Sequence, residues 1–297
     1  MKNSVKRMII MMLACVLIFS SVSVNNSISA EAAAKVTKIK LSKKNLTINV
    51  GSSKKLAVSI SPTKAKKRKV TWTSSNKKVA TVKNGKVTGV SVGTATITAK
   101  AGGKKASCKV RVTLSEKAKN AVKEYKKYLG NKRIKTDTGF VNSQDVKFVL
   151  ADVNVDGVPE LFIDVGSSGG QQTDWQKMYC YYGEKITEIG GGHSDITYYP
   201  ISGIVSICSV QNAPITEIIS YYKISKNGKY SMIARSWDTL LDEYEDTYWW
   251  KGKIVTKSKF YSNLKRAVGK KKIKIRESDW YQNNEKNREK MSKLVKW

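Results

Sequence analysis

Residues 70–99 read VTWTSSNKKVATVKNGKVTGVSVGTATITA, and this stretch decides the fold of the N-terminal part of the chain. Apolar and polar residues alternate along most of it, which is typical of strands that bury one face. Asn84-Gly85 stands between two alternating runs, and this pair supplies the positive φ angles that a tight hairpin turn needs. Trp72 is the large side chain expected at the centre of a sandwich of two sheets. The stretch therefore predicts a small β-sandwich made of short strands.

Residues 36–113 resemble the bacterial Ig-like domain, group 2 (BIG2), in the order of the tryptophan strand, the Asn-Gly turn and the Gly-Thr-Ala-Thr-Ile-Thr strand. The resemblance implies an all-β Ig-like sandwich in a surface-exposed protein, where the domain is a spacer or a binding module. We therefore expect the protein to hold or bind something outside a cell. Apolar residues that alternate on both sides of the central stretch support the sandwich: Leu56, Val58 and Ile60 before it, and Cys108, Val110 and Val112 after it.

The N-terminus has the pattern of a secretory signal peptide, which we expect to span residues 1–32. Basic residues precede an apolar run from Met8 to Phe19, and Ala30-Glu31-Ala32 fits an A-x-A cleavage site. The run is short for a membrane span, so we expect a secreted protein with no transmembrane span in the mature chain, attached to the cell wall, if at all, without a covalent bond. Leu13-Ala14-Cys15 leaves a lipoprotein processing site as an alternative, although the apolar run continues after the cysteine.

The basic residues are concentrated in the Ig-like segment. Between Ala32 and Thr113 there are 21 Lys and Arg residues and no Asp or Glu, in a chain whose net charge is +32. Such a surface attracts polyanions, and for a secreted protein we expect anionic cell-envelope polymers or polysaccharide rather than nucleic acid. The alternative is that the lysines only solvate the sheets and prevent edge-to-edge pairing. The densest cluster, expected to bind polyanions, consists of Lys64, Lys66, Lys67, Arg68 and Lys69.

Residues 114–297 predict a second, α+β domain. Apolar residues recur at helical spacing from Ala118 to Leu129, and Gly130 follows as a helix stop. Beyond residue 145 strand-like runs alternate with tight turns such as Asn227-Gly228, which predicts an antiparallel β-meander, and two further helices are expected near 257–267 and 284–296. The fold class is thus multi-domain: an Ig-like sandwich followed by an α+β domain with a meander and flanking helices.

This second domain resembles a poorly characterised module that follows Ig-like domains in secreted proteins of Gram-positive, Clostridia-type gut bacteria. The matching segments are FVLADVNVDGVPELFI, the Tyr-Tyr strand after GGHSD, and WWKGKIVTKSKF. The resemblance implies no known activity.

Residues 152–160, in DVNVDGVPELFI, carry oxygen-bearing side chains at alternate positions before a glycine, as in the first half of a calcium-binding loop. The last carboxylate of an EF-hand is missing because Ile163 stands at its position. The loop resembles the strand-flanked D-x-N-x-D-G-x-x-E type of FG-GAP repeats, which implies a structural Ca²⁺ ion. The alternative is a metal-free turn in which the side chains bond to their own backbone. The predicted ligands are Asp152, Asn154, Asp156, the carbonyl of Val158, and Glu160.

Aromatic residues are concentrated in the second domain, where all 14 tyrosines of the chain lie. In a doublet on a strand one residue faces the core and its neighbour faces outward. The outward rings could stack on sugars or on a protein partner, with core packing as the alternative. The predicted ligand-binding residues are Trp249, Trp250, Tyr198 and Tyr221.

Cysteine residues beyond the signal peptide are expected to be structural. Cys108 should pack as a small hydrophobic residue. Cys180 and Cys208 both lie in the second domain, and a disulfide between them is left open because sequence does not reveal connectivity.

An extracellular hydrolase with an Ig-like accessory domain is the alternative function. The acidic segment from Asp238 to Asp246 could supply paired carboxylates, and Asp238 and Asp242 would share a face if the segment were helical. A solvated acidic face is the simpler interpretation. His193, with Asp195 beside it and Cys180 upstream, lacks a recognisable nucleophile motif. Since no catalytic constellation is identified, we expect a binding protein rather than an enzyme.

Overall fold

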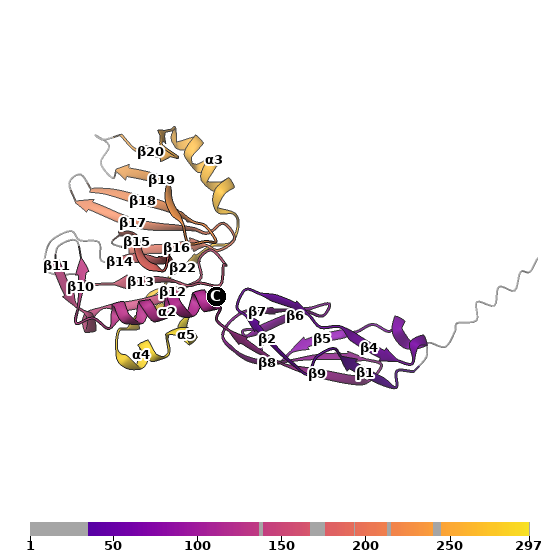
Figure 1. Cartoon of the computed structure of the whole chain (residues 1–297). Coiled ribbons are helices and arrows are strands. Elements are labelled where there is room, and N and C mark those ends of the chain that lie inside the picture. Colours follow the sequence, from indigo (N-terminus) through magenta and orange to yellow (C-terminus); the bar gives the residue numbers. More distant parts are fainter. Residues whose placement is uncertain are drawn as a thin grey trace, which may run out of the picture.

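The chain folds into a β-sandwich followed by a layered α+β part (Figure 1). The structure is a computed structural model that describes residues 35–136, 139–166, 176–192, 194–212, 215–239 and 245–296. The predicted signal peptide lies outside these ranges. None of the helices within them is long and apolar enough to cross a membrane.

The sandwich has two main sheets. Strands β2, β9, β8 and β5 form one sheet, β3, β7 and β6 form the other, and β1 pairs with β4. Strand β2 runs parallel to β9, so that Asn45 lies opposite Lys109 and Asn49 opposite Thr113. The elements are β1 (Lys38–Leu41), β2 (Asn45–Asn49), β3 (Ser53–Lys55), β4 (Val58–Ser61), η1 (Thr63–Lys67), β5 (Thr71–Ser74), β6 (Ala80–Lys83), β7 (Lys86–Gly89), β8 (Gly93–Ala101) and β9 (Lys104–Thr113).

The sequence alternation produces the sandwich as predicted. Along β8 and β9 every second side chain is buried, including Ile97, Cys108 and Val110, which are fully buried. Asn84 and Gly85 adopt φ angles of 49° and 77°, which confirms the tight turn. The half-buried Trp72 packs against two core clusters at once. A side chain at Gly85 would begin 2.6 Å from Leu56 O and 3.0 Å from the Trp72 ring.

The second part is built in layers. Its elements are α2 (Glu116–Leu129), β10 (Arg133–Thr136), β11 (Gly139–Asn142), η2 (Ser143–Asp145), β12 (Lys147–Ala151), β13 (Glu160–Asp164), β14 (Gln176–Tyr182), β15 (Lys185–Gly192), β16 (Ser194–Tyr199), β17 (Ile204–Asn212), β18 (Ile215–Ile224), β19 (Tyr230–Thr239), β20 (Thr247–Trp250), β21 (Lys253–Ile254), α3 (Lys257–Val268), β22 (Ile273–Lys274), η3 (Glu277–Asp279), β23 (Tyr281–Gln282), α4 (Glu285–Glu289) and α5 (Met291–Leu294). One sheet has the order β15-β14-β13-β12-β23, and the other has the order β21-β20-β19-β18-β17-β16-β22. The predicted meander is therefore confirmed in β16 to β21.

Both faces of each sheet are covered over much of their area. Phe148 and Leu150 of β12 pack on α2, whereas Val149 and Ala151 of the same strand pack on the second sheet. The far face of the second sheet packs on α3 through Phe260. The order of layers is thus α2, first sheet, second sheet, α3 (Figure 1).

Helix α2 forms where the sequence predicts it. Ser115 caps its N-terminus by accepting a hydrogen bond from Ala118 N at 3.2 Å. The buried residues at helical spacing are Ala118, Ala121, Val122, Tyr125 and Leu129. The helix predicted near 284–296 is instead two short helices, α4 and α5, with Lys290 between them.

Candidate functional site

The acidic loop between β12 and β13, residues 152–160, is held by its own backbone. Asp152 accepts hydrogen bonds from Asp156 N (3.1 Å) and Gly157 N (2.9 Å), and Asp156 accepts one from Val158 N (2.7 Å). Glu160 accepts from Val153 N at 3.0 Å. This is the conformation of a turn in which Asp side chains bond to nearby N–H groups.

The loop is also tied to neighbouring elements. Asn154 donates to Ser225 O at 2.9 Å, and the Tyr125 hydroxyl of α2 donates to Pro159 O at 3.0 Å. These contacts join the loop to the turn after β18 and to helix α2. The loop is therefore a junction between layers as well as a turn.

Carboxyl groups are buried in this loop to an unusual degree. Glu160 is 2% exposed and Asp152 is 5% exposed. Burial raises the pKa of Asp152 to about 6, and burial together with the charge of Asp152 raises the pKa of Glu160 well above its usual range. Burial also raises the pKa of Asp156. Lys117 and Lys226 partly offset this effect at Asp156.

The donor chemistry of the loop suits a hard cation, whereas its present geometry does not form a complete site. Carboxylate and amide oxygens are the ligands that Ca²⁺ prefers, and a carboxylate oxygen that accepts one N–H retains a lone pair for a cation. In the described ranges no group of three or more His, Cys, Asp or Glu side chains is arranged to hold a metal ion. Calcium binding would therefore require these side chains to rearrange.

The Ig-like domain meets the second domain at this loop. A side chain at Gly157 would begin 3.0 Å from Val50 O of the Ig-like domain, so the two backbones approach closely there. A cavity of about 220 Å³ lies beside this contact, lined by Val50 and Gly89 from one domain and by Asp152 and Tyr198 from the other. The loop thus lies at the domain boundary, a placement that the motif alone did not indicate.

The prediction that Tyr198 and Tyr221 bind a ligand through outward-facing rings is wrong. Tyr198 is 2% exposed and Tyr221 is 7% exposed. Tyr198 packs between the two sheets and Tyr221 packs under α3, because both faces of the second sheet are covered. Trp250 also packs on that helix, with its ring centroid 6.2 Å from that of Phe260.

Trp249 lies on the opposite face of its strand from Trp250. It pairs with Arg235 of β19, so the two side chains share a face. The Arg235 guanidinium lies 5.4 Å from the centroid of the Trp237 ring, two residues along the same strand. The remaining candidate for ligand binding is therefore the group Trp249, Trp237 and Arg235. Trp237 and Arg235 were not singled out from the sequence.

The disulfide left open between Cys180 and Cys208 does not form, and both cysteines are buried thiols. The Cys180 thiol donates to Gly228 O at 3.4 Å, and the Cys208 thiol donates to Glu217 Oε1 at 3.4 Å. Burial raises the pKa of Cys180 to about 12, which does not suit a nucleophile. Cys108 is buried, as predicted. His193 lies outside the described residues.

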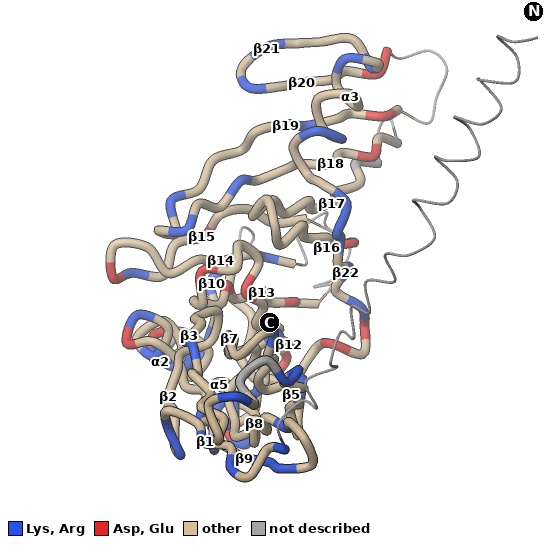
Figure 2. Tube along the Cα trace, turned by 90° about the vertical axis from the view of Figure 1, so that its right-hand side faces the viewer, with Lys and Arg blue, Asp and Glu red and all other residues tan. Residues whose placement is uncertain are grey.

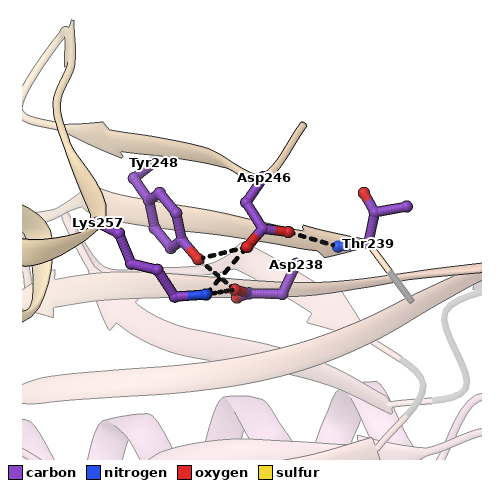
Figure 3. A network of polar contacts seen from close by, with 5 residues as sticks. All are labelled: Asp238, Thr239, Asp246, Tyr248 and Lys257. Atoms are coloured by element: carbon purple, nitrogen blue, oxygen red, sulfur yellow. Dashed lines mark hydrogen bonds and ion pairs between the residues drawn. The ribbon is translucent and has the colours of Figure 1, made fainter. Parts of the chain in front are cut away.

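The acidic segment is not helical at Asp238, which belongs to strand β19. Figure 3 shows how Asp238 and Asp246 meet around Tyr248 and Lys257. The Tyr248 hydroxyl donates to Asp238 and to Asp246 Oδ2 (3.1 Å), and Lys257 Nζ lies 3.0 Å from Asp246 Oδ2. Lys257 holds the pKa of Asp246 below its usual value. The network fastens the start of α3 to the sheet; Asp242 and Glu243 lie outside the described residues.

The predicted polyanion cluster follows strand β4, at the end of the Ig-like domain away from α2 (Figure 1). We call it the tip cluster: Lys64, Lys66, Lys67, Arg68 and Lys69. Lys64, Arg68 and Lys69 are exposed, whereas Ala65 is buried and anchors the short helix. The cluster is thus accessible at these positions.

A second cationic surface was not singled out from the sequence. Lys109 and Arg111 are exposed on β9, and their partners on β2 are Asn45 and Thr47. Figure 2 shows the Lys and Arg positions of the Ig-like domain in blue, several of them near β1, β2 and β9. The sequence feature that could have indicated this surface is the alternation of cationic and apolar residues at 109–112, KVRV.

Comparison with known proteins identifies the sandwich. Residues 35–110 match the family model of the bacterial Ig-like domain (group 2). The matched segment contains the Asn-Gly turn and the strands described above, which confirms the predicted resemblance for this domain. No curated protein matches the chain.

The matching solved structures include an enzyme and a surface-layer protein. A GH10 xylanase from termite gut that contains a bacterial Ig-like domain is 27% identical over 24% of this chain and 19% of its own length, with a TM-score of 0.21. Domains 4 and 5 of the S-layer protein SbsC are 25% identical over 26% of this chain and 46% of that chain, with a TM-score of 0.25. The chain therefore spans less than half of the length of either structure.

Proposed function

We propose that the protein is secreted and binds anionic polymers of a Gram-positive cell envelope through its Ig-like domain. The observation that carries the proposal is the charge of that domain: 21 basic residues and no acidic residue between Ala32 and Thr113. Exposed cations at the tip cluster and on β9 place this charge at the surface. Binding to a polyanion then gains free energy from counterion release.

Binding to isolated Gram-positive cell walls should be strongly salt-dependent. If about six phosphates are contacted, affinity should fall on the order of 10³-fold between 50 mM and 200 mM salt. Co-sedimentation with walls, followed by quantification of the bound protein, measures this. Walls stripped of their anionic polymers are the control. Equal retention at low and high salt would contradict the proposal.

The second domain supplies a separate recognition surface in this proposal. Trp249, Trp237 and Arg235 present a half-buried aromatic group with one cation, which suits a carbohydrate or a protein ligand. A glycan array probed with the parent and with Trp249→Ala tests the carbohydrate class. Binding by the parent that is lost in the variant is expected, and no bound glycan would contradict this ligand class.

We further propose that the acidic loop binds a structural Ca²⁺ ion through Asp152, Asn154, Asp156, the Val158 carbonyl and Glu160. Support comes from the three closely spaced carboxyl groups, each with a pKa raised by burial. A cation would offset their mutual repulsion and their desolvation. The ion would fix the conformation of the loop. The contact with the Ig-like domain at Gly157 is made by the protein backbone itself.

Calcium should stabilise the parent protein, and Asp156→Ala should abolish this effect. For a dissociation constant near 10⁻⁴ M, about 10 mM calcium adds roughly 2.7 kcal/mol. Thermal unfolding with calcium and with a chelator measures the shift. Asp145→Ala, at an exposed position outside the loop, is the matched control and should keep the full effect. No calcium effect on the parent would refute the site.

A further inference from the structure

The outer face of the sheet β2-β9-β8-β5 is composed of cations and uncharged polar residues. On β9 the exposed positions include Lys109 and Arg111. Their cross-strand partners on β2 are Asn45 and Thr47. On the other side, β8 pairs Thr96 with Lys109 and Thr94 with Arg111. Each cation is therefore flanked on both sides by a side chain that can donate or accept a hydrogen bond.

Two hollows lie along β9, and further cations line one of them. One, of about 540 Å³, is lined by Lys40, Lys43, Lys44 and Ser107 and by the apolar residues Ile39, Leu41 and Ala106. The other, of about 230 Å³, is lined by Lys109 and Arg111 with their β2 partners. Lys109 N donates to Lys44 O at 2.8 Å, so a residue lining one hollow is bonded to a residue lining the other. We call this surface the β9 face: Lys40, Lys43, Lys44, Lys109 and Arg111 with their polar neighbours.

We propose that the β9 face, rather than the tip cluster, is the primary contact of the Ig-like domain, and that its partner is a linear polyol-phosphate polymer. This proposal rests on the proposed function and names the surface and the partner within it. The cations at Lys109 and Arg111 recur every second residue, about 7 Å apart along the strand. Phosphates separated by a single glycerol unit have a spacing of the same order. Lysine and arginine ammonium and guanidinium groups bind phosphate oxygens, and threonine hydroxyls add neutral donors.

The absence of aromatic residues favours this partner over nucleic acid. Trp72 is the one aromatic residue in the sequence from 35 to 113, and it packs against the core. Single-stranded nucleic acids gain much of their affinity by stacking bases on aromatic rings. The β9 face offers no such ring, so its chemistry suits a flexible polymer that carries phosphates without bases.

Two variants that remove equal charge test the proposal. One combines Lys44→Gln, Lys109→Gln and Arg111→Gln on the β9 face. The other combines Lys64→Gln, Arg68→Gln and Lys69→Gln in the tip cluster. All six side chains are exposed, so both variants should fold, which circular dichroism and thermal unfolding would verify. The probe is immobilised poly(glycerol phosphate), with single-stranded DNA and isolated cell walls as parallel ligands.

We expect the β9 variant to bind poly(glycerol phosphate) roughly 10- to 50-fold more weakly at physiological salt, with a salt slope reduced by about 2. The tip variant should stay within a few-fold of the parent. Equal losses in both variants would mean that binding follows net charge, and would overturn the proposal, as would a loss in the tip variant alone. Tighter binding of DNA than of poly(glycerol phosphate) would overturn the choice of partner. A parent that binds walls but not poly(glycerol phosphate) would refute the inference and leave the proposed function standing, whereas a parent that does not bind walls refutes both.

Discussion

Phe260→Ala is expected to lower the free energy of unfolding by about 3–5 kcal/mol, because it removes the centre of the aromatic cluster under α3. Phe260 is fully buried. Its ring centroid lies 5.3 Å from those of Tyr248 and Tyr261, and 6.2 Å from those of Tyr221 and Trp250. The surrounding rings are rigid and cannot fill the cavity that alanine would leave.

Urea unfolding monitored by near-UV circular dichroism measures this loss. The matched control is Phe140→Ala, since Phe140 is 62% exposed on β11 and loses little packing. We expect the control to change the free energy of unfolding by less than about 0.5 kcal/mol. Similar losses in the two variants would show that α3 does not depend on the Phe260 cluster.

Asn283→Asp is expected to cost about 2–5 kcal/mol although it changes a single atom of the side chain. The Asn283 amide is 2% exposed, and it donates to Leu129 O and to Ser143 O, both at 2.8 Å. Aspartate has no N–H group, so each carbonyl oxygen would lose one donor, at about 1–3 kcal/mol each; Ser143 O keeps its bond from Val146 N. Arg288, which donates to Asn283 Oδ1 at 2.9 Å, would still bind the remaining oxygen.

Asn284→Asp is the matched control at the next position. Asn284 is exposed and caps α4 by accepting from Asn287 N at 2.9 Å, a bond that aspartate makes equally well. The control should therefore be close to neutral in chemical denaturation. For Asn283→Asp the loss should be smaller in acid, because the protonated carboxyl can donate to one carbonyl. A neutral Asn283→Asp would contradict the role of this amide in joining α2 to the C-terminal segment.

Local patterns in the sequence predicted those parts of the fold that depend on local rules. The positive φ angles at Asn84-Gly85 follow from the residue types alone, and the buried stripe of α2 follows from its spacing. The alternation of burial on β8 and β9 also follows from the pattern.

Predictions that depended on tertiary packing were less successful. Tyr198 and Tyr221 were predicted to face solvent because one face of a strand usually does. Here a second sheet covers one face and α3 covers the other. Whether Cys180 and Cys208 meet is likewise decided by the packing of separate sheets, which no spacing rule reveals. The strand state of Asp238 was missed because the acidic segment has no apolar alternation of its own.

The β9 face was missed for another reason. Its cations come from β1, the segment before β2, and β9, which are distant in sequence and are brought together by the parallel pairing of β2 with β9. The tip cluster attracted attention because its residues are contiguous. Charge density along a chain is thus a poor guide to charge density on a sheet.

The parallel pairing of β2 with β9 also has a mechanical consequence. A pull between the N-terminal side of the sandwich and its exit at Thr113 draws β2 and β9 in opposite directions along their common axis. The force then shears the paired segments Asn45–Asn49 and Lys109–Thr113 past each other. The backbone hydrogen bonds between them must therefore break together rather than one after another. Tension applied between the two ends of the sandwich is therefore resisted by all of these hydrogen bonds at once.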